Sequence, residues 1–192
     1  LDMSIIVDGT GSGTRAAVTA SNSLMVTGIT EDAYVSAAGK GEAFNITTSL
    51  LTYSGTAPFA QNCLYIKNNE TRDLEMVGWF IGELNNRTGG SPTTPILFEM
   101  YGNPTGTAVG TDLAIVNRRI GAPRQFNIEA KAQPTGVTGS GSPLLFQLHY
   151  GSRGFGSVNF TVPAGQSILV VADFASDSQA LYTGFTGYVR GE

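Results

Sequence analysis

Hydrophobic and polar residues alternate over short stretches along most of the chain, which is the pattern of β-strands with one buried face. Leu144, Phe146 and Leu148 lie on one side of an extended backbone, whereas Gln147 and His149 lie on the other. No stretch shows the three-to-four-residue spacing of a convincing amphipathic helix. The predicted strands share β-branched or aromatic residues and flanking Gly, Pro, Asn or Ser, and they cover residues 62–68, 74–84, 95–101, 144–150, 157–162, 166–174 and 181–189.

Two of these stretches, residues 77–81 and 167–172, are apolar on both faces. Strands of this kind lie in the middle of a sheet or under a neighbour that covers the second face, and that neighbour could be another subunit. Residues 121–143 predict one short strand near residues 125–130, followed by a long Gly/Ser/Thr loop. Together the strands predict an all-β fold, an antiparallel β-sandwich of jelly-roll type with two four-stranded sheets, over residues 42–192.

Residues 1–41 differ from the rest of the chain in the glycine-rich runs that interrupt their strand-like pieces. Short strand-like pieces, MSIIVD, RAAVT, LMVTG and AYVSA, are separated by the Gly-rich run at residues 9–14 and by AAGKGE at residues 37–42. Glycine-rich turns allow the chain to change direction and to approach another backbone closely. We therefore expect residues 1–41 to form an N-terminal arm or hairpin layer beside the sandwich domain of residues 42–192.

The composition narrows the class of protein further. A chain of 192 residues suits one sandwich domain, and its charged share of 14% is well below the roughly 25% of ordinary soluble domains, so part of the surface is expected to be covered. The net charge of -4 excludes a nucleic-acid partner, since phosphate binding needs clustered Lys and Arg. No stretch is long and apolar enough for a membrane span, and the first residues lack the pattern of a signal peptide. With one cysteine the chain forms no internal disulfide, which favours assembly in the cytoplasm.

The chain offers few groups for catalysis. His149 is the one histidine and Cys63 the one cysteine, there is no G-x-S-x-G motif, and no paired ligands mark a zinc site. We expect Cys63 to be a buried structural thiol and His149 a partly exposed or interface residue, with no catalytic residue, no cofactor and no metal. A glycosidase is a further candidate function, because glycoside hydrolysis uses a pair of carboxylates and five could meet in space: Glu83, Glu99, Asp112, Glu129 and Asp173.

Aromatic residues raise the question of a sugar platform on the sandwich. Trp79 lies in the apolar segment VGWFIG and is predicted to pack in the core. For Tyr182, Phe185 and Tyr188 the sequence leaves two alternatives, packing in the core or forming a sugar platform. Gly184 and Gly187 between them would let another backbone approach closely.

The segment VDGTGSGTRAAVTASNSLMV, residues 7–26, resembles one that recurs in structural proteins of tailed bacteriophages. It combines Asp-Gly, a Gly-rich turn, a small-residue strand, and an Asn followed by a short apolar strand. EAFNITT, CLYIKNNE and EMYGNPTGT are similar to strands and a turn of such proteins, although Ser23 stands where a basic residue usually follows the Asn. The resemblance implies a protein of the capsid exterior, often a trimer around a jelly roll, and it identifies no active site.

These observations predict a non-enzymatic virion protein, a capsid decoration or cement protein, that assembles in the host cytoplasm and binds the outside of a phage capsid. Its partner would be the major capsid protein, whose subunits it would bridge as a homotrimer and thereby stabilise. The alternative is a receptor- or carbohydrate-binding β-sandwich module of a phage head fibre or tail. The candidate interface residues are apolar and glycine positions of the N-terminal segment and arginines suited to an acidic capsid surface: Ile5, Val7, Gly9, Gly11, Gly13, Arg15, Leu24, Val26, Arg118, Arg119 and Arg153.

Overall fold

The chain divides into two compact units, Leu1–Asp32 and Ala33–Glu192. The computed structural model describes residues 6–7, 15–18, 24–25, 33–54, 59–83, 96–150, 154–174 and 178–190. In the first unit three short strands pair antiparallel in the order β1-β2-β3: β1 (Ile6–Val7), β2 (Arg15–Val18) and β3 (Leu24–Met25). All other described elements belong to the second unit, which therefore contains the whole sandwich.

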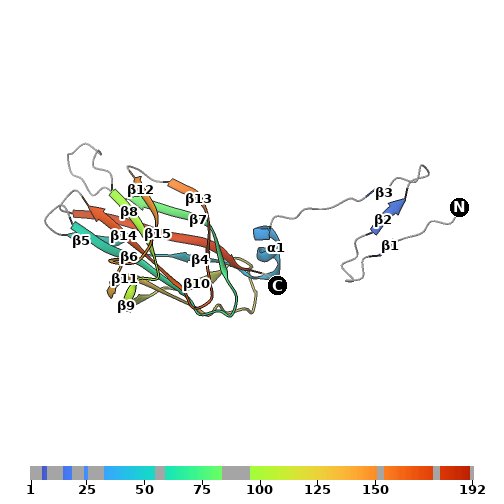
Figure 1. Ribbon diagram of the computed structural model, residues 1–192, viewed down its shortest axis with the longest axis horizontal. Coiled ribbons are helices and arrows are strands. Elements are labelled where there is room, and N and C mark those ends of the chain that lie inside the picture. The colour runs from blue at the N-terminus through green and yellow to red at the C-terminus, as the bar shows by residue number, and fades with distance from the viewer. Residues whose placement is uncertain are drawn as a thin grey trace. The chain divides into compact units, whose positions relative to one another are not determined.

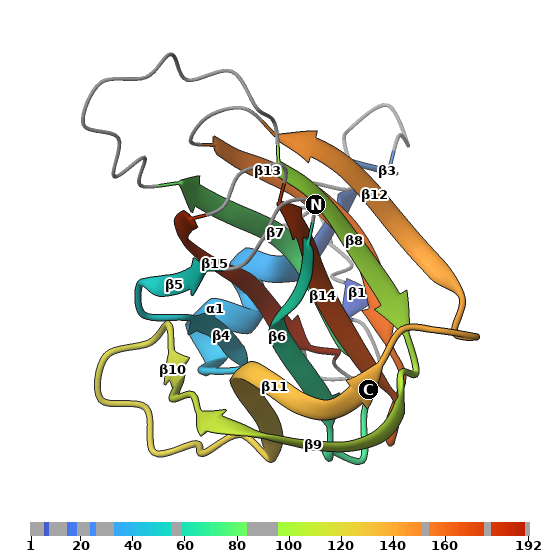
Figure 2. The same cartoon turned by 90° about the vertical axis from the view of Figure 1, so that its left-hand side faces the viewer.

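The second unit consists of two antiparallel sheets packed face to face, with one short helix (Figures 1 and 2). Sheet I has the strand order β10-β4-β15-β7-β13, with β5 also paired to β15. Its strands are β4 (Ala43–Thr47), β5 (Leu51–Ser54), β7 (Leu74–Glu83), β10 (Ile115–Asn117), β13 (Gly154–Val162) and β15 (Ser178–Val189). Sheet II has the order β12-β8-β14-β6-β11-β9. Its strands are β6 (Phe59–Asn68), β8 (Ile96–Gly102), β9 (Thr105–Asp112), β11 (Ile128–Thr138), β12 (Leu144–Tyr150) and β14 (Ser167–Phe174).

The all-β, antiparallel sandwich predicted from alternation is confirmed, and each of the seven strands predicted from residue 62 to residue 189 forms a strand. The expectation of two four-stranded sheets was wrong, because each sheet has six strands. The strands without a counterpart in the predicted pattern include β5, β9 and β10, which are short or exposed, and β11 continues beyond the short strand predicted near residues 125–130. Such strands carry a weak alternation of apolar and polar residues, so their pattern does not separate them from loops.

The helix α1 (Ala33–Lys40) corrects the prediction of a strand at AYVSA. Alanine has the highest helix propensity, and the buried Ala37 turns the helix toward the sandwich. Gly41 ends the helix with φ +76°, where its N–H donates to Ala38 O at 3.1 Å and the N–H of Glu42 donates to Ala37 O at 2.8 Å. This is the Schellman arrangement, which favours Gly at its left-handed position.

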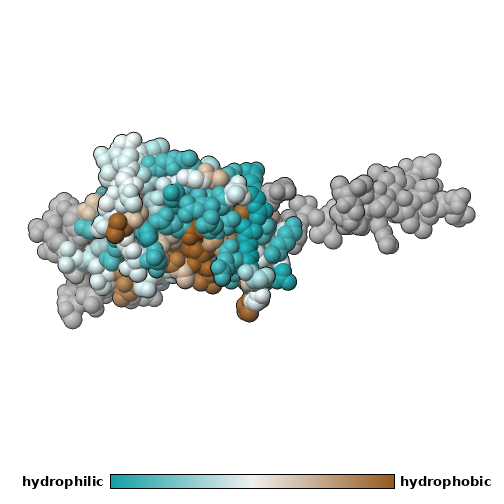
Figure 3. Space-filling view, turned by 90° about the horizontal axis from the view of Figure 1, so that it is seen from below, coloured by the Kyte–Doolittle hydropathy of each residue, from teal (hydrophilic) through white to brown (hydrophobic). Residues whose placement is uncertain are grey.

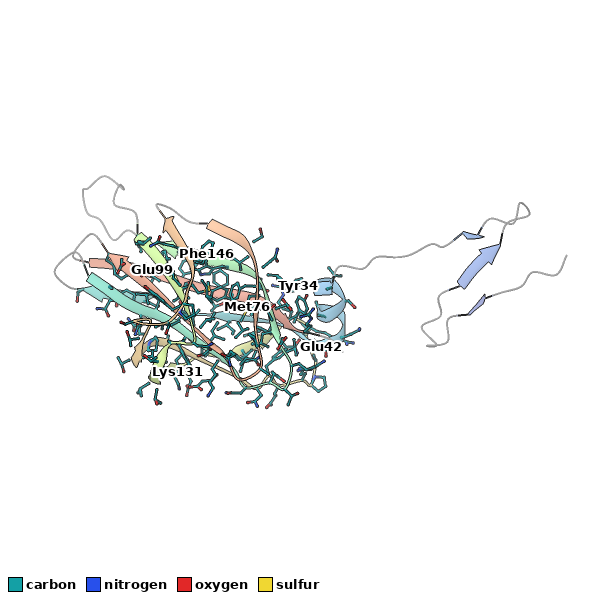
Figure 4. All side chains as sticks on the ribbon, viewed as in Figure 1. Tyr34, Glu42, Met76, Glu99, Lys131 and Phe146 are labelled. Atoms are coloured by element: carbon teal, nitrogen blue, oxygen red, sulfur yellow. The ribbon has the colours of Figure 1, made fainter. Side chains whose placement is uncertain are left out.

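The core lies between the two sheets and is formed by the inward positions of their strands. Met76 of β7 lies inside it, as Figure 4 shows, and Trp79 of the same strand is 3% exposed. The Trp79 ring stacks on Phe185 at 5.7 Å between ring centres, and its Nε1 donates to Thr183 Oγ1 at 2.8 Å. The predicted core position of Trp79 is confirmed, and Phe185 is a core residue as well. The face of the second unit seen in Figure 3 is correspondingly mostly hydrophilic, with hydrophobic residues in one strip and at isolated points.

Strand β14, predicted to be apolar on both faces, is buried on both. One face packs toward sheet I, and on the other an apolar cluster joins residues of β6, β9, β11 and β14: Tyr65, Ala108, Val137, Leu169 and Val171. Strand β11 extends to Thr138, so the loop predicted after residue 130 was wrong over its first part. Asn62 Nδ2 holds this part of β11 by donating to Pro134 O and Val137 O, both at 3.0 Å. The second face of β14 is therefore covered by the protein's own chain rather than by another subunit.

Candidate functional site

The predicted interface residues fall into three groups in the structure. Ile5, Gly9, Gly11, Gly13, Val26 and Arg153 lie outside the described residues. Val7, Arg15 and Leu24 are placed through their backbone in β1, β2 and β3 of the first unit. Arg118 and Arg119 follow β10 in the second unit, and both side chains are exposed. Only these last two can be examined as parts of a surface.

Arg118 lies at a hollow of about 590 Å³ on the outer face of sheet I. The other lining residues come from α1, β4, β7 and β15, and they are Tyr34, Asn45, Thr47, Val77, Phe80 and Thr186. Their side chains point away from the core because they alternate with buried neighbours such as Phe44 and Ile46 of β4. Tyr34 lies on α1 at the same end of the sandwich as Glu42, whereas Glu99 lies toward the other end (Figure 4). We call this feature the sheet I hollow.

A chain of hydrogen bonds fixes the polar side of the sheet I hollow. The hydroxyls of Tyr34 and Thr186 lie 2.9 Å apart, and Thr186 Oγ1 donates to Phe44 O at 3.3 Å. The amide of Asn45 is satisfied when its Nδ2 donates to Thr186 Oγ1 at 2.9 Å and its Oδ1 accepts from Arg118 Nη1 at 3.2 Å. Each polar group thereby holds the next, so the side chains keep their positions before any ligand arrives.

The apolar side of the hollow depends on a glycine of the neighbouring strand. Gly184 of β15 lies opposite Phe80 of β7, and a Cβ atom at position 184 would lie 2.3 Å from Phe80 Cζ and 2.1 Å from Ile46 O. The Phe80 ring therefore lies against the backbone of Gly184, where a side chain would otherwise stand. The sequence pattern singled out Gly184 as a point of close backbone approach, but it gave no sign that an aromatic ring of the same sheet occupies the space.

We expect Gly184→Ala to lower the free energy of unfolding by about 1–3 kcal/mol, which is the usual cost of overpacking a tight site. The added methyl group meets a backbone oxygen, which cannot move aside as a flexible side chain would. Urea unfolding followed by circular dichroism measures the change. Gly39→Ala in α1 is the matched control, because nothing lies within 4 Å of its added Cβ, and it should stabilise the helix by about 0.5–1 kcal/mol. An unchanged stability for Gly184→Ala would contradict the ring's placement.

The two arginines after β10 have different surroundings. Arg119 Nη1 donates to Gly39 O at 2.8 Å, so this side chain satisfies a carbonyl in the last turn of α1. Arg118 has its guanidinium against the Asn45 amide at the hollow. Within the described residues, neither arginine forms an ion pair, whereas Arg72 and Arg124 both pair with Glu42. The hollow thus has a positive charge at its edge that no described carboxylate neutralises.

Of the five carboxylates considered for glycosidase chemistry, Glu99 and Asp173 share the outer face of sheet II. Tyr101 donates to Glu99 Oε2 at 2.5 Å, and Gln147 Nε2 donates to Glu99 Oε1 at 3.0 Å. Burial raises the pKa of Asp173, and the negative charge of Glu99 adds to this effect. The same hydrogen bond to Glu99 is the main cause that raises the pKa of Tyr101 to about 12.

The three other carboxylates are placed as follows. Asp112 and Glu129 both pair with Lys131, at 2.6 Å and 3.6 Å, and the side chain of Glu83 lies outside the description. None of the four whose side chains are described, Glu99, Asp112, Glu129 and Asp173, lines the sheet I hollow. The structure therefore brings two pairs of carboxylates together on sheet II, opposite the hollow: Glu99 with Asp173, and Asp112 with Glu129 beside Lys131.

The two residues considered for nucleophilic chemistry lie away from the hollow as well. Cys63 is fully buried in β6, and burial raises the pKa of its thiol from an ordinary value of 9.0 to about 12. The thiolate needed for nucleophilic attack is therefore disfavoured at neutral pH, and the prediction of a buried thiol is confirmed. His149 belongs to β12 by its backbone, and its imidazole lies outside the description.

Two further searches cover the described part of the chain. They find no group of three or more His, Cys, Asp or Glu side chains that could hold a metal ion. They also find no helix long and apolar enough to cross a membrane.

The fold and the hollow define the chain as a β-sandwich with a fixed polar and aromatic surface on one sheet. No protein-family model matches the chain, and no curated protein is significantly similar to it in sequence.

Proposed function

We propose that the chain is a non-enzymatic virion protein that decorates the outside of a tailed-phage capsid, and that its sandwich has jelly-roll topology. Strands β4-β15-β7-β13 of sheet I pack on strands β12-β8-β14-β6 of sheet II. From β12 onward consecutive strands alternate between the two sheets, as do β6, β7 and β8. This order, with β9, β10 and β11 as an insertion, supports the jelly-roll assignment.

The observation that carries the proposal is the division of the chain into a sandwich with its own core and a small unit whose described strands are short. The sandwich buries a continuous cluster between its sheets. The described strands of Leu1–Asp32 have only two to four residues each. Strands this short are marginal in isolation, and adding them to the sheet of another chain satisfies their backbone groups. In this account the N-terminal unit attaches to the major capsid protein, while the sandwich lies on the capsid exterior.

One feature of sheet II supports association between copies, with a homotrimer as the proposed state. Strand β12 is the edge of sheet II, and its Leu144, Leu145 and Phe146 are 48%, 51% and 39% exposed. Large apolar side chains beside an unpaired strand edge are a common feature of surfaces that associate.

Capsid particles of the virus that encodes the chain provide the test. A protein that bridges capsid subunits adds buried area across the contacts between them, so more heat is needed to separate the subunits. We expect particles that carry the protein to release their genome at a higher temperature than particles without it, and added purified protein to restore the difference. Equal release temperatures, or protein that stays in solution when mixed with bare particles, would overturn the proposal.

The alternative, a receptor- or carbohydrate-binding module of a head fibre or tail, is favoured by one observation. The sheet I hollow combines an aromatic ring with fixed hydrogen-bonding groups, which is the composition of many small-molecule sites. Binding of this kind is compatible with a place on the capsid.

A further inference from the structure

We propose that the sheet I hollow binds an acidic saccharide, with a sugar ring against Phe80 and Val77 and the sugar's carboxylate at Arg118. The inference does not rest on capsid attachment, because it uses only residues of the second unit. It assigns a ligand class to the surface that Tyr34, Asn45 and Thr186 hold in place.

The positions of the strands decide against an extended peptide as the ligand. The hollow lies over β4, β15 and β7, and each of these has a hydrogen-bonded neighbour on both sides. A peptide that adds a strand needs an unpaired sheet edge, and each of these three described strands is already paired on both sides. A ligand in the hollow must therefore be recognised by side chains, as saccharides are.

The lining side chains match the two surfaces of a sugar ring. Phe80 and Val77 are partly exposed and supply an apolar surface for the C–H groups of the ring. Thr47 supplies a hydroxyl at the hollow, and the oxygens of Tyr34 and Asn45 each keep an acceptor position beside their bonds in the internal network, to which a sugar hydroxyl can donate. The volume of about 590 Å³ falls within the range of about 300–1,000 Å³ of small-molecule sites.

The charge at the edge of the hollow selects an acidic sugar over a neutral one. Arg118 uses Nη1 for Asn45 Oδ1 and keeps further N–H donors of its guanidinium, and it pairs with no carboxylate among the described residues. Arg119, the next residue along the chain, donates to Gly39 O and forms no described ion pair either. A guanidinium binds a carboxylate through charge-assisted hydrogen bonds, which are about twice as strong as neutral ones.

Nucleic acid is a poorer fit than an acidic sugar, although both are anionic. The chain carries a net charge of -4, and the lining of the hollow contains a single arginine. Binding to a phosphate backbone depends on many cationic contacts, whereas one sugar carboxylate needs one.

The test begins with a glycan array that contains uronate- and sialate-bearing glycans beside their neutral counterparts, probed with the full chain. Isothermal titration then compares the acidic glycan that binds best with its methyl ester, which keeps the ring and removes the charge. We expect the ester to bind at least about tenfold more weakly, a difference of about 1.4 kcal/mol. No binding of any acidic glycan at millimolar concentration, or equal binding of acid and ester, would overturn the proposal.

Three variants locate the site. Arg118→Gln should weaken binding of the acidic glycan about tenfold or more and leave binding of the ester unchanged. Phe80→Leu keeps an apolar side chain but removes the ring, and it should weaken binding of both ligands. Lys67→Gln removes the same charge from β6 in sheet II and should bind both ligands as the parent does. Equal thermal unfolding midpoints would show that the variants fold.

Other patterns would contradict the proposal. Unchanged binding in Arg118→Gln or Phe80→Leu would place the glycan elsewhere on the protein. Binding of an Asp/Glu-rich peptide that displaces the glycan and is equally sensitive to Arg118→Gln would identify an acidic peptide as the ligand class. Each outcome is measured on free protein, so it is independent of whether the chain decorates particles.

Discussion

Trp79→Ala is expected to lower the free energy of unfolding by about 3–5 kcal/mol, the range for removing a large aromatic side chain from a core. Trp79 is 3% exposed and stacks on Phe185. Its edge-to-face ring contacts with Phe98 and Phe146 join it to sheet II. The variant also leaves the hydroxyl of Thr183 without the indole N–H that it accepts at 2.8 Å. A loss of this size is a large fraction of the stability of an ordinary domain.

Urea unfolding followed by circular dichroism measures the effect, because Trp79 is the one tryptophan and its fluorescence is lost in the variant. Two controls separate its roles. Trp79→Phe keeps a ring in the core and should be less destabilising than alanine. Thr183→Val keeps the ring but leaves its N–H unpaired, and should cost about 1–3 kcal/mol. A loss below about 1 kcal/mol in Trp79→Ala would contradict a core centred on this residue.

The strands of the sandwich could be predicted from the sequence because their local pattern and their burial agree. Along β8 the burial alternates strictly from Ile96 to Gly102, and β13 shows the same alternation from Ser157 to Val162. Local alternation of this kind reflects the period of a half-buried strand and needs no knowledge of partners. Trp79 was predicted correctly for a different reason, since its apolar neighbours indicated a strand in the middle of a sheet, where β7 lies.

Features that depend on distant partners could not be predicted in this way. The segment AYVSA alternates like a strand, yet it forms α1, where Ala37 packs against the sandwich and Tyr34 contacts Thr186. Strand β11 was predicted as a loop beyond residue 130, because its Gly and Thr residues are typical of loops. In the structure this part of the strand is held by distant contacts such as that of Asn62 with Val137. Tertiary contacts override weak local preferences in both segments.

The sheet I hollow could not be predicted from the sequence for a related reason. It is assembled from α1, three strands and the residue after β10, and none of these segments shows a binding motif by itself. Arg118 alone was selected, for its charge and not for its position. Gly184 gave a usable signal, since a glycine within an apolar strand often marks a close approach, but its pairing with Phe80 was visible only in the structure.

Deletion of Leu1–Asp32 is the second variant with a large expected effect. The cut follows the division between the two units and keeps α1, because Ala37 is buried and Tyr34 is bonded to Thr186 within the second unit. The sandwich should therefore keep its core and its thermal unfolding midpoint. If the short strands of the first unit attach the protein to the capsid, the shortened chain loses those contacts.

Occupancy of the shortened chain on bare capsid particles, quantified after sedimentation beside the full chain at equal concentration, tests the attachment of the N-terminal unit most directly. Lys67→Gln in the full chain is the matched control and should decorate particles as fully as the parent, because Lys67 belongs to β6 of the second unit and is not among the candidate interface residues. The account predicts a shortened chain that unfolds at the parent's temperature and occupies particles at least about tenfold less, a loss of about 1.4 kcal/mol or more in binding. A shortened chain that decorates particles as fully as the parent, or one that no longer folds, would contradict it.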